Sequence, residues 1–113
     1  QESIPNWAAW EESVLVNARK RQDEAQAEFA AFFTDIGVDA LLVPAAVGEA
    51  PVGLHDTGGS LFTRAWVVLH GPEVAVPGLT GEAGMPIGVQ LVGPHGSDAR
   101  VLAVSAWLHR IIA

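Results

Sequence analysis

The stretch Gly84-Met85-Pro86-Ile87-Gly88-Val89-Gln90-Leu91-Val92-Gly93 decides the fold of this chain. It is rich in β-branched and aliphatic residues, with a glycine at each end and a proline near its start, so it predicts a strand. Two similar runs precede it, at residues 40–44 and 74–77. All three are short and largely apolar, which is typical of strands covered on both faces. Because long helical stretches lie before the first run and after the last, we expect an α/β fold with a mixed β-sheet flanked by helices.

The segment from residue 6 to about residue 36 predicts one long helix, since good helix formers dominate its second half. Asn6 is suited to cap its start, and Gly37 is suited to end it. Trp7 and Trp10 would then lie one turn apart on this helix. Two readings stay open for this pair: packing against a neighbour, or an exposed aromatic surface that binds a partner.

Turn residues divide the rest of the chain into short elements. We expect a strand over residues 38–45, a loop over 46–59, a helix over 61–69 capped by Ser60, a strand over 73–76, a strand over 86–92 and a last helix capped by Ser97. The short, turn-rich connection between the last two strands predicts an antiparallel hairpin. A loop of about fourteen residues is long for a small domain, and loops of that length are usually functional or disordered.

Composition excludes several classes of function. The net charge of −7 argues against a nucleic-acid partner, because phosphate binding needs clustered Lys and Arg. The absence of cysteine excludes disulfides, thiolate nucleophiles and Cys-rich zinc sites, and it agrees with a cytoplasmic location. No apolar run is long enough to span a membrane. Half of the residues are hydrophobic, which is a high fraction for so short a chain. We therefore expect part of the surface to meet a partner or the rest of a larger protein.

The chain offers no convincing catalytic set. Its four histidines lack the spacing of a helical metal pair, and we expect no metal and no cofactor. His55, Asp56 and Ser60 supply the residue types of a hydrolytic triad, but a single loop rarely orients all three. Ser60 follows two glycines without completing a nucleophile or phosphate-binding motif, so we interpret it as a helix cap. Lys20 is the only lysine, and it lies on a charged helix face.

The order of these segments resembles the C-terminal portion of amidase signature enzymes. The resemblance covers residues 29–113, and its most specific part is the stretch quoted first. It is carried by Asp39-Ala40-Leu41-Leu42-Val43-Pro44, by Thr57-Gly58 with Phe62 and Trp66, by His70-Gly71-Pro72-Glu73-Val74-Ala75-Val76-Pro77, and by Gly84 to Gly93.

The resemblance implies a serine hydrolase that cleaves carboxamides with a Ser–cis-Ser–Lys triad. The residues of that triad lie upstream of this region in the family, and nothing in this chain matches their motif. We therefore expect residues 1–113 to be a single domain, the C-terminal segment of a larger amidase, inactive in isolation. The family pattern also places the loop of residues 46–59 near the substrate pocket.

Four residues follow as candidate substrate contacts: Asp56, Thr57, Phe62 and Trp66. A structural reading remains beside this one, because Phe62 and Trp66 have the spacing of a core stripe on a helix. Gln90 lies within an apolar strand, so its amide either stabilises the core through a partner or has a functional contact.

The partners implied are the N-terminal catalytic part of the amidase, or a second copy of this chain, because isolated strands leave unpaired edges. A small-molecule amide would be the substrate of the intact enzyme. The alternative function is a non-catalytic binding or assembly module that keeps the amidase-derived scaffold.

Overall fold

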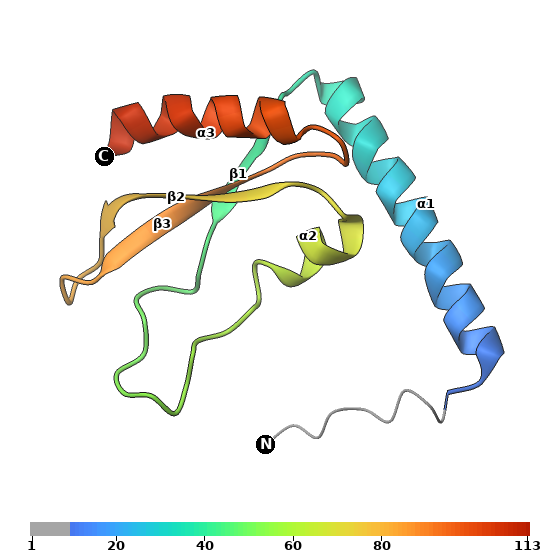
Figure 1. Cartoon of the computed structure of the whole chain (residues 1–113), viewed down its shortest axis with the longest axis horizontal. Helices are drawn as coiled ribbons and strands as arrows, with labels where there is room; N and C mark the ends of the chain where they lie inside the picture. Colours follow the sequence, from blue (N-terminus) through green and yellow to red (C-terminus); the bar gives the residue numbers. More distant parts are fainter. Residues whose placement is uncertain (1–9) are drawn as a thin grey trace.

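The computed structural model describes residues 10–113 (Figure 1). Its elements are α1 (Glu12–Ile36), β1 (Leu41–Pro44), α2 (Arg64–Leu69), β2 (Glu73–Thr80), β3 (Pro86–Val92) and α3 (Asp98–Ile112). The expected α/β fold is confirmed, because helices flank a single three-stranded sheet in the described part of the chain.

The sheet has the strand order β1-β3-β2, and both pairs of neighbours are antiparallel. The predicted hairpin is thus confirmed, while the expectation of mixed strand directions is wrong. β2 continues past its predicted end at Val76 to Thr80, with an irregularity between Pro77 and Leu79. Proline has no N–H to donate to a neighbouring strand. It is tolerated there because β2 is an edge strand, whose outer side makes no hydrogen bonds within the sheet. The central strand β3 has its predicted bounds.

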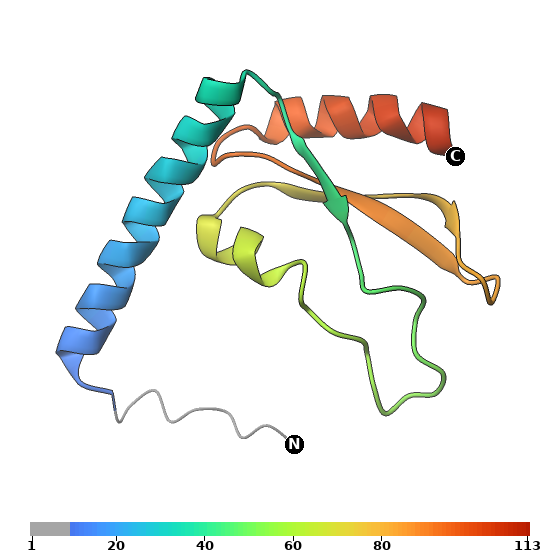
Figure 2. The same cartoon turned by 180° about the vertical axis from the view of Figure 1, so that it is seen from behind.

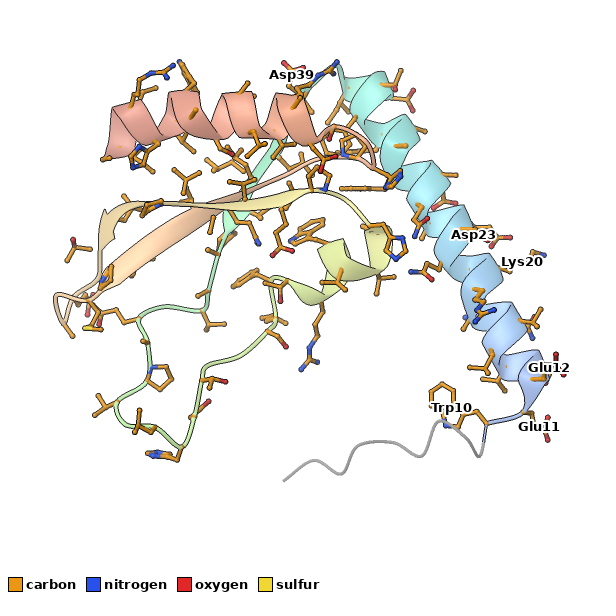
Figure 3. All side chains as sticks on the ribbon, in the orientation of Figure 1. Trp10, Glu11, Glu12, Lys20, Asp23 and Asp39 are labelled. Atoms are coloured by element: carbon orange, nitrogen blue, oxygen red, sulfur yellow. The ribbon has the colours of Figure 1, made fainter. Side chains whose placement is uncertain are left out.

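Helix α3 covers one face of the sheet and makes the main core (Figure 1). Val101 of α3 is fully buried against Val76 and Leu91, and six partly buried side chains surround them. These are Ala40, Val74, Val89, Val104, Leu108 and Ile112. An ion pair also joins the first turn of α3 to the segment between α1 and β1, since Arg100 Nη1 lies 3.3 Å from Oδ1 of Asp39, which is labelled in Figure 3. The closing helix therefore holds the sheet from one side.

The opposite face of the sheet looks toward α2 and the loop that precedes it (Figure 2). Gln90 and Val92 are buried on this face in the second half of β3. The expectation of strands covered on both faces is wrong for β1, where Leu42 is 60% exposed. β1 is a short edge strand, so only one neighbour shields its side chains.

Helix α1 ends as predicted but begins later than predicted. The N–H of Gly37, which has φ of 67°, donates to Phe33 O at 3.0 Å and closes the helix. The helix begins at Glu12 and not after Asn6, so Trp10 precedes it. Asn6 and Trp7 lie outside the described residues. The prediction that both tryptophans lie one turn apart on this helix is therefore wrong for Trp10.

Two other predicted caps differ in detail. Residues 60–63 form a turn, in which the N–H groups of Thr63 and Arg64 donate to Ser60 O, so α2 begins at Arg64 and Ser60 does not cap it. Ser97 does stand at the N-cap position of α3, but its hydroxyl donates to Pro94 O at 2.6 Å. The first strand is also shorter than the predicted 38–45, since only Leu41–Pro44 pair with β3.

Helix α1 contacts the rest of the chain mainly through α2. The ring of Phe29 lies 5.8 Å from that of Trp66 and 5.0 Å from that of Phe33, which is buried. The remainder of α1 projects away from the sheet (Figures 1 and 2). No helix within residues 10–113 is both long and apolar enough to cross a membrane.

Candidate functional site

The loop of residues 46–59 bends back toward the start of β3 and forms a cavity of about 280 Å³ with it. The lining comes from three short segments, residues 46–51, 57–59 and 86–88. The volume is just below the range of about 300–1,000 Å³ for small-molecule sites. This is the region where the resemblance places a substrate pocket.

Local hydrogen bonding shapes the far side of this loop. The N–H of Gly58 donates to Asp56 Oδ1 at 2.8 Å, which is an Asx-turn. Gly58 has φ of 84°, a conformation that a residue with a side chain adopts only under strain. The turn brings Thr57 into the cavity wall beside Gly58 and Gly59.

The near side of the loop is held by Glu49, a residue that the sequence did not single out. Its Oε1 accepts the N–H of Ala83 and the N–H of Met85, each at 3.0 Å. Its Oε2 accepts the N–H of Ala83 at 3.1 Å. These two donors lie at the tip of the β2–β3 hairpin, more than thirty positions further along the chain. The only feature of the sequence that marks Glu49 is that it is an acidic residue between small and apolar neighbours.

The structure separates the four predicted site residues into two pairs. Thr57 lines the cavity, and Asp56 precedes it in the same turn. Phe62 and Trp66 do not line this cavity. They are half-buried, and Trp66 packs against Phe29 of α1.

The polar groups on the buried face of β3 form a second feature. The Nε2 of Gln90 donates to Oε1 of Glu73, across the β2–β3 pair. Burial raises the pKa of the Glu73 carboxyl, because the ionised form loses hydration there. In the described part of the chain, the buried Gln90 Oε1 and Trp66 Nε1 have no hydrogen-bond partner.

The groups that a hydrolytic triad would need are far apart or otherwise engaged. Lys20 lies on the outer side of α1, away from the sheet, and its side chain is 74% exposed beside Glu24 (Figure 3). Ser60 Oγ accepts a hydrogen bond from Arg64, and Ser105 donates to a backbone carbonyl within α3. Within residues 10–113, no group of three or more His, Cys, Asp or Glu side chains could hold a metal ion.

Comparison with known proteins gives one family. The sequence model described as "Amidase" matches residues 3–102. A mitochondrial glutamyl-tRNA(Gln) amidotransferase subunit from Mus musculus is 31% identical over 108 residues, which cover 88% of this chain and 20% of the relative. The putative amidase AmiA2 of Mycobacterium tuberculosis (strain ATCC 25618 / H37Rv) is 31% identical over 112 residues, which cover 88% of this chain and 23% of the relative. The chain thus spans about a fifth of the length of these curated relatives.

Proposed function

Because this chain belongs to the amidase family, we propose that it is the C-terminal segment of an amidase whose intact form hydrolyses a carboxamide to a carboxylic acid and ammonia or an amine. The observation that carries this proposal is the family match over residues 3–102. The sequence blocks that resemble the end of the amidase pattern support the C-terminal assignment.

The reaction proposed for the intact enzyme is acyl transfer to a serine and then to water. A serine hydroxyl attacks the amide carbon, a lysine takes the proton and passes it to the leaving nitrogen, and backbone N–H groups stabilise the oxyanion. Water then cleaves the acyl-enzyme to release the acid. These residue roles follow from the family resemblance, and none of them is assigned to a residue of this chain.

We propose that the chain alone is inactive. The solvated position of Lys20 supports this, because a lysine that acts as a base needs burial or a tuned neighbour to lower its pKa. The hydroxyl of Ser60, the serine nearest the cavity loop in sequence, points into a bond with Arg64 at 2.9 Å. No lysine stands beside that hydroxyl in the described structure, so the proton acceptor of the family mechanism is missing.

The contribution of this chain to the intact enzyme is part of the substrate pocket. We assign Asp56 and Thr57 as substrate contacts, supported by the position of Thr57 in the cavity wall and by the hydrogen bond from Gly58, another lining residue, to the Asp56 carboxylate. Phe62 and Trp66, which do not line the cavity, are assigned with them on the family pattern. The unpartnered N–H of Trp66 supports a role for it, because a buried donor calls for an acceptor from another molecule or segment.

The proposed partner is the N-terminal catalytic part of the amidase, or a further copy of this chain. Large exposed apolar side chains on three separate elements support an additional covering layer: Leu42 on β1, Val67 on α2 and Trp107 on α3. The name of one relative identifies it as part of a larger enzyme, which supports an assembly here as well. A cytoplasmic location is part of this proposal, and a chain without cysteine is compatible with that reducing compartment.

Labelling with a fluorophosphonate probe for serine hydrolases tests this assignment, with intact mass as the readout. We expect no adduct on the 113-residue chain, and one adduct per molecule on the full-length protein, at a serine outside this segment. A stoichiometric adduct at Ser60 of the isolated chain would contradict the proposed inactivity.

Ammonia release from a panel of simple carboxamides then separates the enzyme from the alternative of a binding module. We expect release by the full-length protein and none by the isolated chain. A full-length protein with neither an adduct nor ammonia release would favour the non-catalytic module.

A further inference from the structure

We propose that Glu49 is a positioning residue, whose carboxylate fastens the loop of residues 46–59 to the tip of the β2–β3 hairpin and so sets the shape of the cavity. This inference rests on the proposed function to the extent that the cavity is the substrate pocket. The fastening itself stands on contacts within this chain.

The contacts are those of a carboxylate that binds a pair of backbone donors. Both oxygens of Glu49 face the N–H of Ala83, and Oε1 also faces the N–H of Met85. The hairpin tip is preorganised to present these groups, because the N–H of Gly81 donates to Met85 O at 2.9 Å and the N–H of Gly84 donates to Gly81 O at 3.1 Å. Hydrogen bonds from N–H groups to an ionised carboxylate are stronger than those between neutral groups.

Glu49 is also the point at which the loop is attached. Every other residue from 46 to 60 is exposed, whereas Glu49 is half-buried. In the part of the chain that the structure describes, no other hydrogen bond joins residues 46–59 to a segment outside them. Among the described residues, the hydrogen bonds that hold this loop against the hairpin tip therefore all come from this one side chain.

The hairpin leaves room for the carboxylate at Gly81. A Cβ atom on this residue would overlap Oε1, Cδ and Cγ of Glu49. The overlap involves the end of a flexible side chain, so an alanine at this position would displace Glu49 and leave the hairpin backbone in place. Gly81 thus offers a way to disrupt the contact without removing the carboxylate.

The cavity lies between the two segments that Glu49 joins. Residues 46–51 and 57–59 of the loop form one wall, and residues 86–88, directly after the hairpin tip, form the other. Release of Glu49 would let the loop wall move relative to the strand wall. Substrate binding depends on such positioning, while the chemical step depends on groups that we place outside this chain.

The first experiment measures amide hydrogen exchange of Ala83 and Met85 by NMR in the 113-residue chain. We compare the unmodified chain with Glu49→Gln, which keeps the size of the side chain but faces the two donors with one acceptor oxygen and an amide group. We expect exchange at both amides to become at least about tenfold faster, as for loss of hydrogen bonds to a charged acceptor. Gly81→Ala should give the same change by displacing Glu49.

Glu82→Gln is the matched control. It makes the same change in charge, at the hairpin tip itself, and Glu82 is exposed and makes no hydrogen bond among the described residues. We expect its exchange rates at Ala83 and Met85 to equal those of the unmodified chain. Unchanged exchange in Glu49→Gln, or an equal effect of Glu82→Gln, would overturn the inference.

The second experiment measures amide hydrolysis by the full-length protein with the same substitutions. We expect Glu49→Gln to raise KM at least about threefold with little change in kcat, since a loose pocket wall weakens binding more than chemistry. Faster exchange with an unchanged KM would overturn the positioning role. The proposed function would fail on a different result, namely that the unmodified full-length protein hydrolyses no carboxamide. In that case the amide hydrogen exchange of Ala83 and Met85 alone decides whether Glu49 holds the loop.

Discussion

Gln90 lies in the central strand β3 with only 3% of its surface exposed, and a buried primary amide needs partners for both its nitrogen and its oxygen. The nitrogen donates to Glu73, but the oxygen has no partner among the described residues. Glu73 is on the same face of the sheet, two positions from the residue that pairs with Gln90. A protonated or amidated Glu73 side chain has a donor to offer to that oxygen, and an ionised one has none.

Glu73→Gln is therefore expected to stabilise the fold at pH 7 by about 1 kcal/mol, since it removes a half-buried charge and supplies a donor beside Gln90. Burial raises the pKa of Glu73 above its unfolded value of about 4.3. The folded state thus binds this proton more tightly, so the associated stability is complete below about pH 4.3 and is lost as the pH rises through the folded pKa. Urea unfolding at pH 4 and pH 7 measures both effects.

The benefit of Glu73→Gln should shrink at pH 4, because the raised pKa of Glu73 makes the protonated carboxyl the major form there. Glu82→Gln, on the exposed hairpin tip, is the control and should change stability by less than about 0.5 kcal/mol at either pH. A Glu73→Gln variant that is equally stabilised at both pH values would contradict the titration argument.

The short helix α2 depends on α1 for its last turn. The carbonyl of Val68 is among the last four of α2, which have no partner within the helix. It accepts a hydrogen bond from Gln22 Nε2 at 2.9 Å and another from Gln26 Nε2 at 3.0 Å. The two glutamines are one turn apart on α1, so both reach the same acceptor. Gln22 also contacts Nε2 of His70, the residue that ends α2 in the left-handed conformation.

Because the two donors are redundant, Gln22→Ala and Gln26→Ala should each lower the free energy of unfolding by less than about 0.5 kcal/mol, and the double variant by about 1–2 kcal/mol. Chemical denaturation measures the three values. Asn17→Ala, on the same helix and exposed, controls for the better helix propensity of alanine. Single losses that simply add up to the double loss would show that the donors act independently.

The elements differ in how far the sequence could predict them. β3 was predicted with its bounds because its composition, its flanking glycines and its proline all agree on a strand. The end of α1 followed from Gly37, but its start did not follow from Asn6, since several residues near a helix start are equally able to cap it. β2 extends past Pro77 because it is an edge strand, and edge position is a property of the sheet that no local pattern contains.

The residues of the candidate site could be predicted only in part, for a related reason. The loop and Thr57 were identified through the family pattern and lie at the cavity. Glu49 was missed because its partners, the N–H groups of Ala83 and Met85, are backbone groups that every residue except proline carries. When a side chain binds backbone N–H groups, the identity of the partner residues does not matter. The sequence therefore contains no pair of residue types that would indicate such a contact.

The molecule as a whole is flat and open. Its principal extents are 48 × 41 × 19 Å, and its radius of gyration is 17.1 Å, where a compact chain of this length would have about 13 Å. Its accessible surface is 8465 Å², compared with about 6000 Å² for a compact monomer of this mass. Nineteen large hydrophobic side chains are exposed and five hydrophobic residues are buried in the described part of the chain. Such a surface favours association with another chain or segment.

We expect the isolated 113-residue chain to form dimers or larger assemblies in solution, because both outer strands of the sheet, β1 and β2, have an unpaired edge. Size-exclusion chromatography with light scattering at several concentrations measures this. Leu42→Lys on β1 and Leu79→Lys on β2 place a charge at exposed edge positions, and at least one of them should shift the chain toward a monomer. Val52→Lys adds the same charge to the exposed loop and should leave the assembly unchanged. An unmodified chain that remains a well-behaved monomer at every concentration would refute association through these edges, and the N-terminal part of the amidase would then be the remaining candidate to cover them.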